Sequence, residues 1–251
     1  MKEYALIGHP VEHSKSQVFF NEKFRLEGID AQYINVDLDS LSRLRRFLLM
    51  HPHLCGFNVT SPFKTAILPY LHTLDVEASY VGAVNTVVVQ KSFWGKRRLI
   101  GFNTDVEGFY QSMLSIMKPH YNKALVLGTG GASLAVQRAF KKLGIMTLVA
   151  SRREAFEDTI GYDQLTPELI ASCPIIVNAT PVGMSPHILA MPPIPYEALT
   201  PNHLCYDLIY APEETRFLRM ARAQGATIKN GIDMLLIQAN ENWRIWSEYG
   251  K

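Results

Sequence analysis

Two ionisable side chains, Lys64 and Asp105, stand in motifs that combine them with small polar residues. Lys64 ends the segment 58–64 (NVTSPFK), and Asp105 ends the segment 101–105 (GFNTD). Hydride transfer to a ketone leaves an alkoxide, and an ammonium held near a carboxylate can stabilise that charge and supply the proton. A surface lysine and an aspartate that begins a helix fit the same residues. The spacing alone leaves both interpretations open.

Amides and hydroxyls recur at the ends of the apolar runs, or inside them, in the first half of the chain. These residues are Ser14, Ser16, Asn58, Thr60, Asn85, Thr86, Asn103 and Thr104. Burying such a group costs roughly 2–7 kcal/mol unless it is hydrogen-bonded. Either these groups bond to one another, or they bind a polyhydroxylated ligand in the crevice outside the strand ends. A single buried asparagine is more often structural, whereas several separate clusters favour a ligand.

A glycine-rich turn follows the apolar run 124–127 and precedes a segment of helical period. The turn reads GTGGAS over residues 128–133. A strand, a glycine turn and a helix in this order direct backbone N–H groups and a positive helix end toward a pyrophosphate. Ser133 stands where the dinucleotide-binding fingerprint has its third glycine. The turn by itself therefore leaves dinucleotide binding open.

The next predicted strand ends at Ala150 and is followed by Ser151, Arg152 and Arg153. An acidic residue about 20 residues after the glycine turn would hold the ribose of NAD, whereas arginine there suits the 2′-phosphate of NADP. The two arginines favour NADP. Glu154, directly after them, leaves some use of NAD open.

Short runs rich in Val, Ile and Leu, among them the predicted strands 54–59, 83–89 and 204–209, alternate with longer segments of helical period along the whole chain. This pattern is typical of βαβ units and mostly parallel sheets. A helix that starts near Val106 ends before Pro119, and a new α/β unit starts at Lys123. We therefore predict two α/β domains, residues 1–105 and 106–232, the second a Rossmann-like doubly wound domain. One long helix is expected over 233–249.

The chain has 251 residues, 47% hydrophobic and 19% charged, and its 25 Lys and Arg nearly balance 23 Asp and Glu. These values exclude disordered, collagen-like and small disulfide-rich proteins. The densest basic run, 43–46, is short, and no apolar run approaches about 18 residues, so we expect neither a nucleic-acid partner nor a membrane span. Cys55, Cys173 and Cys205 are far apart, which favours a reducing, cytoplasmic setting. The histidines have no metal-ligand spacing, so no metal site is expected.

Several motifs, taken together and in order, resemble those of the shikimate dehydrogenase family. The motifs are 13–16 (HSKS), 58–60 (NVT) with 62–64 (PFK), 82–86 (GAVNT), 101–105 (GFNTD) with Gly108 and Phe109, 178–180 (NAT) with Gly183 and Met184, 206–210 (YDLIY), and Gly231 through Met234 and Leu235 to Gln238 and Ala239. The resemblance runs from one end of the chain to the other. It is far more specific than the glycine turn.

The resemblance implies a reversible, NADPH-dependent reduction of 3-dehydroshikimate to shikimate, a step in aromatic amino acid biosynthesis. It implies that Lys64 and Asp105 are the catalytic pair. The implied substrate-binding residues are Ser14, Ser16, Asn58, Thr60, Asn85, Tyr210 and Gln238. The implied cofactor-binding residues are Gly128, Thr129, Gly130, Gly131, Ala132, Ser151, Arg152, Arg153, Thr180, Leu208 and Gly231.

The resemblance also implies that residues 1–105 bind the substrate, that residues 106–232 bind NADP, and that the C-terminal helix 233–251 returns to complete the first domain. We expect a monomer or a homodimer that acts on a small molecule. The sequence departs from the family at Thr129, where alanine is usual, and at Pro181, where serine is usual. Both departures concern backbone geometry only.

A third departure concerns the cofactor, because residues 151–153 (SRR) replace a more common Asn-Arg-Thr. The quinate/shikimate branch, which tolerates NAD, also has two arginines followed by an acidic residue. A quinate/shikimate dehydrogenase with relaxed cofactor use is therefore an alternative. A non-catalytic ligand-sensing homologue is a further alternative, but such a protein should have lost Lys64 or Asp105, and both are present.

Overall fold

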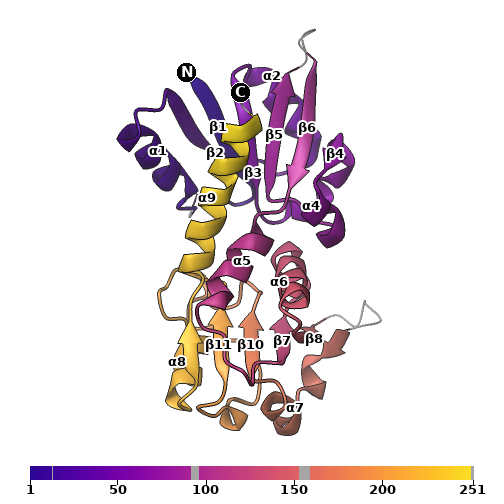
Figure 1. Ribbon diagram of the computed structural model, residues 1–251, viewed down its shortest axis with the longest axis vertical. Coiled ribbons are helices and arrows are strands. Elements are labelled where there is room, and N and C mark those ends of the chain that lie inside the picture. Colours follow the sequence, from indigo (N-terminus) through magenta and orange to yellow (C-terminus); the bar gives the residue numbers. More distant parts are fainter. Residues whose placement is uncertain (13, 92–95, 153–158, 250–251) are drawn as a thin grey trace. The chain divides into compact units, whose positions relative to one another are not determined.

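The computed structural model describes residues 1–12, 14–91, 96–152 and 159–249. The chain forms two compact units (Figure 1): Met1–Thr104 with Ala239–Lys251, and Asp105–Gln238. This division assigns Asp105 and residues 233–238 to the second unit, whereas the sequence placed them with the first. For residues 233–238, the difference arises because α9 (Ile232–Tyr249) is one continuous helix whose two ends belong to different units.

The first unit is built on a mixed sheet in the order β2-β1-β3-β5-β6-β4. Its strands are β1 (Lys2–Gly8), β2 (Ala31–Asp37), β3 (Leu54–Val59), β4 (Thr73–Leu74), β5 (Thr86–Lys91) and β6 (Arg97–Phe102). Its helices are α1 (Ser16–Leu26), α2 (Leu44–Met50), α3 (Phe63–Ala66) and α4 (Val76–Val81). Among these described strands, only β5 runs antiparallel to its neighbours, β3 and β6. The expected parallel arrangement therefore holds for the rest of this sheet.

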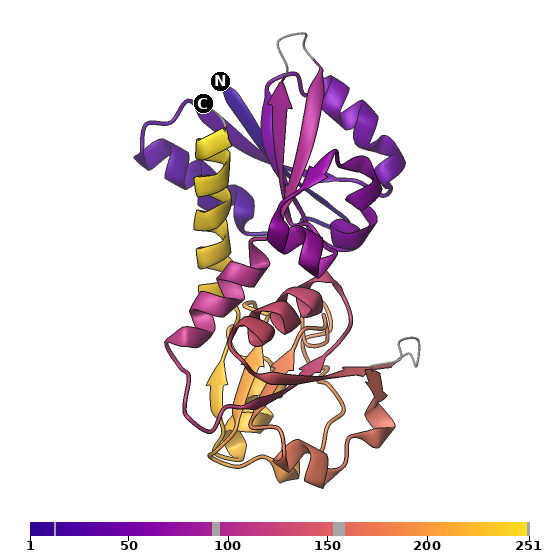
Figure 2. The same ribbon diagram turned by 45° about the vertical axis from the view of Figure 1, so that its right-hand side comes forward.

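Both faces of this sheet are covered, because alternate residues of a strand point to opposite sides. Ala5 and Ile7 of β1 belong to a core that includes residues of α2, whereas Tyr4 and Leu6 belong to a second core with α1 and α9. Figure 2 shows the yellow end of α9 lying along this second face. The last turns of the chain thus complete the first unit.

Trp246 of α9 fixes this packing at one point. Its indole lies where a Cβ on Gly56 of β3 would be, and its Nε1 donates to the carbonyl of Val87 at 3.1 Å. The ring also lies 4.8 Å from that of Tyr4, centre to centre. Any side chain at position 56 would displace the tryptophan.

The second unit is built on a sheet in the order β12-β11-β10-β7-β8-β9, in which every neighbouring pair is parallel. Its strands are β7 (Lys123–Leu127), β8 (Met146–Ser151), β9 (Thr159–Gly161), β10 (Ile175–Asn178), β11 (Leu204–Asp207) and β12 (Thr227–Lys229). Its helices are α5 (Asp105–Leu114), α6 (Gly131–Lys142), α7 (Pro167–Ala171) and α8 (Arg216–Ala223). The predicted fold class, two α/β domains of which the second is Rossmann-like, is confirmed.

Helix α5 is anchored within the second unit. Phe109 lies 5.1 Å from the rings of both Phe140 and Tyr206, and the Ser112 and Tyr206 hydroxyls are 2.9 Å apart. A Cβ on Gly108 would lie only 2.8 Å from the carbonyl oxygen of Met234, so glycine allows α5 to approach the start of α9 closely. In the described part of the chain, no helix is long and apolar enough to cross a membrane.

Candidate active site

The polar segments of the first unit converge at one edge of its sheet. Strands β1, β3 and β6 end at this edge, and β5 begins there because it runs in the opposite direction. Asn58 therefore meets Asn85, which in turn meets Thr104. The predicted strand at 83–89 begins only at Thr86, because the Val84 amide donates to the Lys64 carbonyl at 2.7 Å rather than to a neighbouring strand.

Asn58 uses both ends of its buried amide within the protein. Its Nδ2 donates to the carbonyl of Asn85 at 3.0 Å and to the hydroxyl of Thr86 at 3.1 Å. Its Oδ1 accepts a hydrogen bond of 2.7 Å from the hydroxyl of Tyr33. Asn85 in turn donates from Nδ2 to the hydroxyl of Thr104 at 2.8 Å, and its Oδ1 accepts from the Thr104 amide at 2.8 Å. The amides are therefore held in one orientation.

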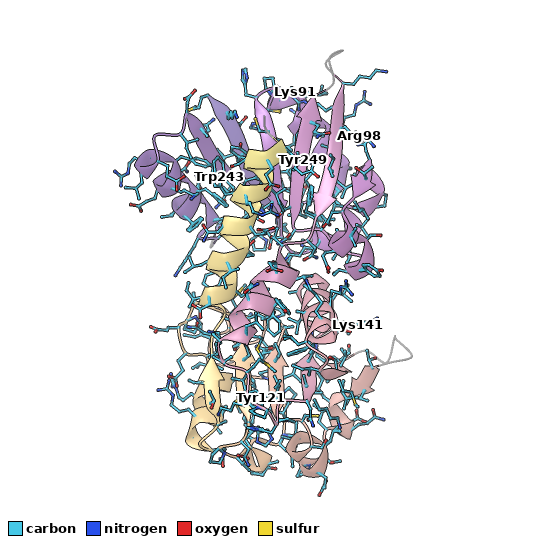
Figure 3. All side chains as sticks on the ribbon, in the orientation of Figure 1. Lys91, Arg98, Tyr121, Lys141, Trp243 and Tyr249 are labelled. Atoms are coloured by element: carbon cyan, nitrogen blue, oxygen red, sulfur yellow. The ribbon has the colours of Figure 1, made fainter. Side chains whose placement is uncertain are left out.

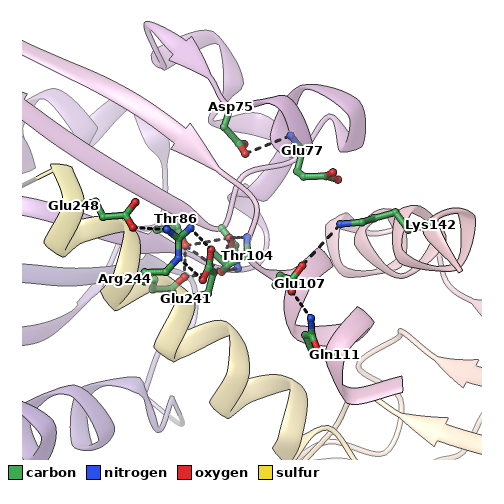
Figure 4. A network of polar contacts seen from close by, with 12 residues as sticks. Asp75, Glu77, Thr86, Thr104, Glu107, Gln111, Lys142, Glu241, Arg244 and Glu248 are labelled. Carbon is green, nitrogen blue, oxygen red and sulfur yellow. Dashed lines mark hydrogen bonds and ion pairs between the residues drawn. The ribbon is translucent and has the colours of Figure 1, made fainter. Parts of the chain in front are cut away.

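Asn242 of α9 joins the same network from the far end of the sequence, at Thr86 and Thr104, which are labelled in Figure 4. It is 1% exposed, and its Oδ1 accepts hydrogen bonds from Thr86 at 2.5 Å and from Thr104 at 2.6 Å. On the outer side of this helix, Arg244 pairs with Glu241 and Glu248. Asn242 lies one helical turn after Gln238, a predicted substrate residue, on the same side of the helix.

Tyr33 is a second member of the network that the sequence did not single out. Burial raises the pKa of its phenol well above the usual range, and a hydrogen bond with Ser16 counteracts this in part. Tyr33 thus links Ser16 to Asn58, both predicted substrate residues. We call the set Tyr33, Asn58, Asn85, Thr86, Thr104 and Asn242 the amide network.

The amide network accounts for the burial of Asn58, Asn85, Thr86 and Thr104 by one of the two explanations that the sequence left open. In this structure they bond to one another, so their burial alone does not require a ligand. The other predicted residues of this unit lie at the rim: Ser14, Ser16, Thr60 and Lys64 are half-buried or exposed there. The Thr60 methyl group occupies the space that a Cβ on Gly8 would need, which brings the end of β1 close to the end of β3.

The glycine turn of the second unit lies at the carboxyl end of β7, where the strand order reverses. Gly128 has a φ of 108°, and a Cβ there would lie 2.9 Å from the Thr180 methyl carbon. Beside Gly130, by contrast, nothing that the structure describes lies within 4 Å of the Cβ position. Helix α6 begins at Gly131, and no described side chain caps it. Within the described residues the turn therefore offers the uncapped N-terminus of a helix and its positive end, the features that suit a phosphate.

Ser151 and Arg152 follow at the carboxyl end of the adjacent strand, β8. Ser151 is 8% exposed, whereas Arg152 is exposed. Burial raises the pKa of the Tyr162 phenol. Arg152 lies close enough to Tyr162 for its positive charge to lower this pKa in part. Arg153 lies outside the described residues. Arg152 is thus available to an anion on this side of the sheet.

The remaining predicted cofactor residues lie on the other side of the glycine turn. Thr180 follows β10, and its amide and hydroxyl both donate to Asn178 Oδ1, at 3.1 and 2.6 Å. Leu208 follows β11, and its carbonyl oxygen occupies the space that a Cβ on Gly231 would need. Thr180, Leu208 and Gly231 therefore lie in tight backbone turns behind neighbouring strands.

Three predicted residues of the reaction site also belong to the second unit. Asp105 is the first residue of α5 and is 5% exposed. Tyr210 is half-buried behind β11. Gln238 is half-buried on α9, and its Nε2 donates to the Leu235 carbonyl at 3.0 Å. Asp105 does begin a helix, as one interpretation of the sequence expected, and this position does not exclude a role in catalysis.

A cavity of about 590 Å³ opens at the opposite edge of the first sheet, among Tyr4, His53, Cys55, Lys91 and Trp243. Lys91 and Trp243 are labelled in Figure 3. None of the predicted site residues that the structure describes lines this cavity. Among the described residues, no group of three or more His, Cys, Asp or Glu side chains is arranged to hold a metal ion.

Comparisons with known proteins agree with this arrangement. Residues 6–87 match the family of shikimate dehydrogenase substrate binding domains. A relative from Ignicoccus hospitalis, named shikimate dehydrogenase (NADP(+)), is 35% identical over 250 residues, which cover 97% of this chain and 92% of the relative.

Solved structures extend the likeness over both units. The shikimate 5-dehydrogenase of Thermus thermophilus, solved in complex with NADP(H) and shikimate, has a TM-score of 0.85 and 34% identity, covering 99% of this chain and 94% of that one. Quinate dehydrogenase from Corynebacterium glutamicum, solved in complex with NAD, has a TM-score of 0.82 and 28% identity, with coverages of 98% and 94%. The resemblance expected from the motifs is confirmed, and the chain belongs to the shikimate dehydrogenase family.

Proposed function

We propose that the chain catalyses the reversible, NADPH-dependent reduction of 3-dehydroshikimate to shikimate. One observation carries the proposal: the likeness to NADP-dependent shikimate dehydrogenases spans nearly the whole chain, and both ionisable residues of the motifs, Lys64 and Asp105, are present. A homologue that only senses a ligand has no need of both. In this proposal the first unit binds the substrate and the second unit binds NADPH.

Lys64 and Asp105 form the acid–base pair of the proposed reaction. Bound NADPH supplies a hydride to the substrate ketone. Negative charge then develops on the ketone oxygen, and the Lys64 ammonium stabilises this charge. Lys64 and Asp105 together supply the proton that completes the hydroxyl, and they remove it in the reverse direction. The half-buried position of Lys64 and the buried position of Asp105 support this role, because water competes less for such groups.

The proposed substrate residues divide into two kinds. Ser14, Ser16 and Thr60 carry hydroxyls at the rim of the first sheet, and hydroxyl groups can donate to the substrate carboxylate. Asn58 and Asn85 are oriented by the amide network before any ligand arrives, so the substrate hydroxyls meet groups that do not need to rearrange. Tyr210 and Gln238 complete the proposed set.

The second unit fits a dinucleotide. Position 128 requires glycine both for its positive φ and for the approach of Thr180, and no atom of the described residues lies within 4 Å of the Cβ position of Gly130. The proposed phosphate contacts are the backbone of residues 128–132, and the proposed contacts of the 2′-phosphate are Ser151, Arg152 and Arg153. Thr180, Leu208 and Gly231 line the far side of the same turn and are proposed to contact the rest of the cofactor.

A two-by-two assay tests this function, with shikimate and quinate each offered NADP and NAD and with nicotinamide absorbance as the readout. We expect the highest kcat/KM for shikimate with NADP. Comparable turnover of quinate with NAD would instead identify the quinate/shikimate branch, to which the double arginine and Glu154 also point. Binding of shikimate without turnover under all four conditions would identify a ligand-sensing homologue.

We further propose that the protein is cytoplasmic, has no nucleic-acid partner and acts as a monomer or a homodimer. Its three cysteines, Cys55, Cys173 and Cys205, are free thiols, and burial raises the pKa of the Cys205 thiol to about 12. Thiols that form no disulfide suit a reducing compartment. Light scattering after size-exclusion chromatography tests the oligomeric state, and an assembly larger than a dimer contradicts this part of the proposal.

A further inference from the structure

A buried carboxylate lies at the end of β11, behind the residues proposed to bind the cofactor. Asp207 is fully buried. Its Oδ1 accepts hydrogen bonds of 3.0 Å from Asn178 Nδ2 and from the Ile209 amide, and its Oδ2 accepts one of 2.6 Å from the Thr215 hydroxyl. All three donors are uncharged. Burying an ionised side chain among neutral donors costs folding free energy. Packing alone therefore does not explain why a carboxylate stands at this position.

The first hydrogen bond leads from Asp207 to the glycine turn. Because Asn178 directs its NH₂ group to Asp207, its carbonyl oxygen is left to accept from the amide and the hydroxyl of Thr180. The methyl group of Thr180 in turn lies against Gly128. If position 207 presented a donor instead, the Asn178 amide would have to turn over and would lose Thr180.

The second hydrogen bond leads from Asp207 to the segment that follows β11. The Ile209 amide donates to the carboxylate, and the Ile209 carbonyl accepts from the Gly231 amide at 3.2 Å. Leu208 and Tyr210 flank Ile209, and the Leu208 carbonyl lies against Gly231. The strand predicted to continue to residue 209 ends at Asp207 because this side chain takes the amide that a further ladder bond would use.

We propose that Asp207 is a positioning residue for the dinucleotide: its carboxylate holds the Asn178–Thr180 turn and the 208–210 segment together, beside the glycine turn that is proposed to bind the cofactor phosphates. The proposal rests on the proposed function. It assigns to Asp207 no contact with the substrate or the cofactor. Asp207 acts through Asn178, Ile209 and Thr215, and its charge serves to orient three donors at once.

The protonation state of Asp207 changes in an accessible pH range. Burial raises the pKa of this carboxyl to about 6, although the bonds from Thr215, Ile209 and Asn178 lower it in part. Tyr196 also faces it, and burial keeps the pKa of that phenol above its usual value. Lys229 of β12 pairs with Asp233, and Arg216 of α8 donates to the Leu189 carbonyl. Below pH 6 the protonated carboxyl loses its negative charge, gains one O–H donor and keeps less acceptor capacity for its three partners.

The test compares Asp207→Asn with Asp75→Asn. Asp75 is the matched control, because it also has a raised pKa and accepts backbone amides, from Glu77 and Ala78, but it caps α4 in the first unit. The Kd for NADPH is measured by fluorescence titration from pH 5.5 to pH 8, with thermal unfolding in parallel. The 2′-phosphate of NADPH titrates in the same pH range. We therefore compare the ratio of each variant's Kd to the wild-type Kd at each pH, because the effect of phosphate titration is the same on both values and cancels.

At pH 8 we expect Asp207→Asn to weaken NADPH binding roughly tenfold, the loss of about one hydrogen bond to a charged group, with a Tm no lower than that of the wild type. The ratio should fall toward one as the pH approaches 5.5, where most of the wild-type Asp207 is itself protonated. Asp75→Asn should bind as the wild type does throughout. A loss of affinity without a loss of stability is not what a merely structural residue produces.

Position 215 provides a second route if Asp207→Asn does not fold. Thr215→Val removes the third donor together with the side-chain cap of α8 and should weaken NADPH binding, whereas Thr215→Ser retains both and should not. The inference is overturned if Asp207→Asn and Thr215→Val bind NADPH as the wild type does at pH 8. It is also overturned if the ratio of the Asp207→Asn Kd to the wild-type Kd is constant from pH 5.5 to pH 8, or if the affinity of Asp207→Asn falls only together with its Tm. A wild-type protein that does not bind NADPH overturns the proposed function itself.

Discussion

Both units bury a polar network behind the ends of their strands, but the two networks differ in charge. In the first unit, the amide network consists of amides and hydroxyls only. In the second unit, Asn178, Thr180 and Thr215 are organised around the carboxylate of Asp207. A neutral network keeps its geometry at every ordinary pH, whereas a network with a carboxylate keeps it only while that group is ionised. The proposed substrate and cofactor units should therefore respond differently to pH and to mutation.

The largest effect should come from Lys64→Ala, which separates chemistry in one unit from binding in the other. We expect kcat to fall about 10²–10⁴-fold, with a smaller change in the KM for shikimate, because a proton-transfer group is lost. The Kd for NADPH should not change. Lys23→Ala, which removes a lysine of α1 that pairs with Glu27, is the matched control. If kcat survives in Lys64→Ala, Lys64 only binds the substrate.

The next effect concerns the stability of the second unit as a function of pH. A carboxyl pKa of about 6 in the folded chain, against an ordinary 3.8, means that ionised Asp207 costs up to about 3 kcal/mol of folding free energy. The contribution of the Asp207 carboxyl to folding stability is fully present below pH 3.8, and it is lost as the pH rises through 6. We expect Asp207→Asn to gain stability over the wild type as the pH rises from 4 to 7, measured by urea unfolding. A constant difference over this range would contradict the raised pKa.

A smaller effect, without any pH dependence, is expected for the amide network. Asn242→Ala removes the acceptor of two buried hydroxyl hydrogen bonds and should lower the free energy of unfolding by about 2 kcal/mol, about 1 for each bond. The loss should be the same at pH 5 and pH 8. Asn240→Ala, at an exposed position of the same helix, should change stability little. A loss in Asn242→Ala that varies with pH would remove the contrast between the networks.

The smallest effect is expected from Arg152→Ala. If Arg152 contacts the 2′-phosphate, its removal should raise the Kd for NADPH about tenfold, or about 1.4 kcal/mol, and should leave the Kd for NADH unchanged. Arg219→Ala, which removes an exposed arginine of α8 in the same unit, controls for the general loss of positive charge. Equal losses for NADH and NADPH would contradict the assignment of the 2′-phosphate.

Much of the fold was predictable, because local patterns determine it. The β3 boundaries, Leu54–Val59, coincide with an apolar run, and α9 coincides with one long segment of helical period. The ends of strands were predicted less well where a side chain or a distant backbone group accepts the hydrogen bond that an amide of the strand would otherwise donate to its neighbouring strand. The Lys64 carbonyl does so for Val84, and the carboxylate of Asp207 does so for Ile209.

The members of the networks were harder to predict, because the residues that they join are far apart in the sequence. Tyr33 bonds to Asn58, 25 residues away, and Thr86 bonds to Asn242, 156 residues away. A signal for Asn242 was nevertheless present, since it lies one turn after Gln238 on the side of the helix that also carries Leu235 and Trp246. A buried polar residue near a predicted site residue on the same helix face is therefore itself a candidate for the site.

The contribution of α9 to the first unit has a consequence for the order of biosynthesis. Residues 239–249 leave the ribosome after the whole of residues 105–238, yet they supply Trp246 to the core around Tyr4 and Gly56 and Asn242 to the amide network. Domains usually complete their folding in the order of their synthesis. Here the unit that is translated first is the last to be completed, and until then the aromatic face of its sheet is exposed to chaperones.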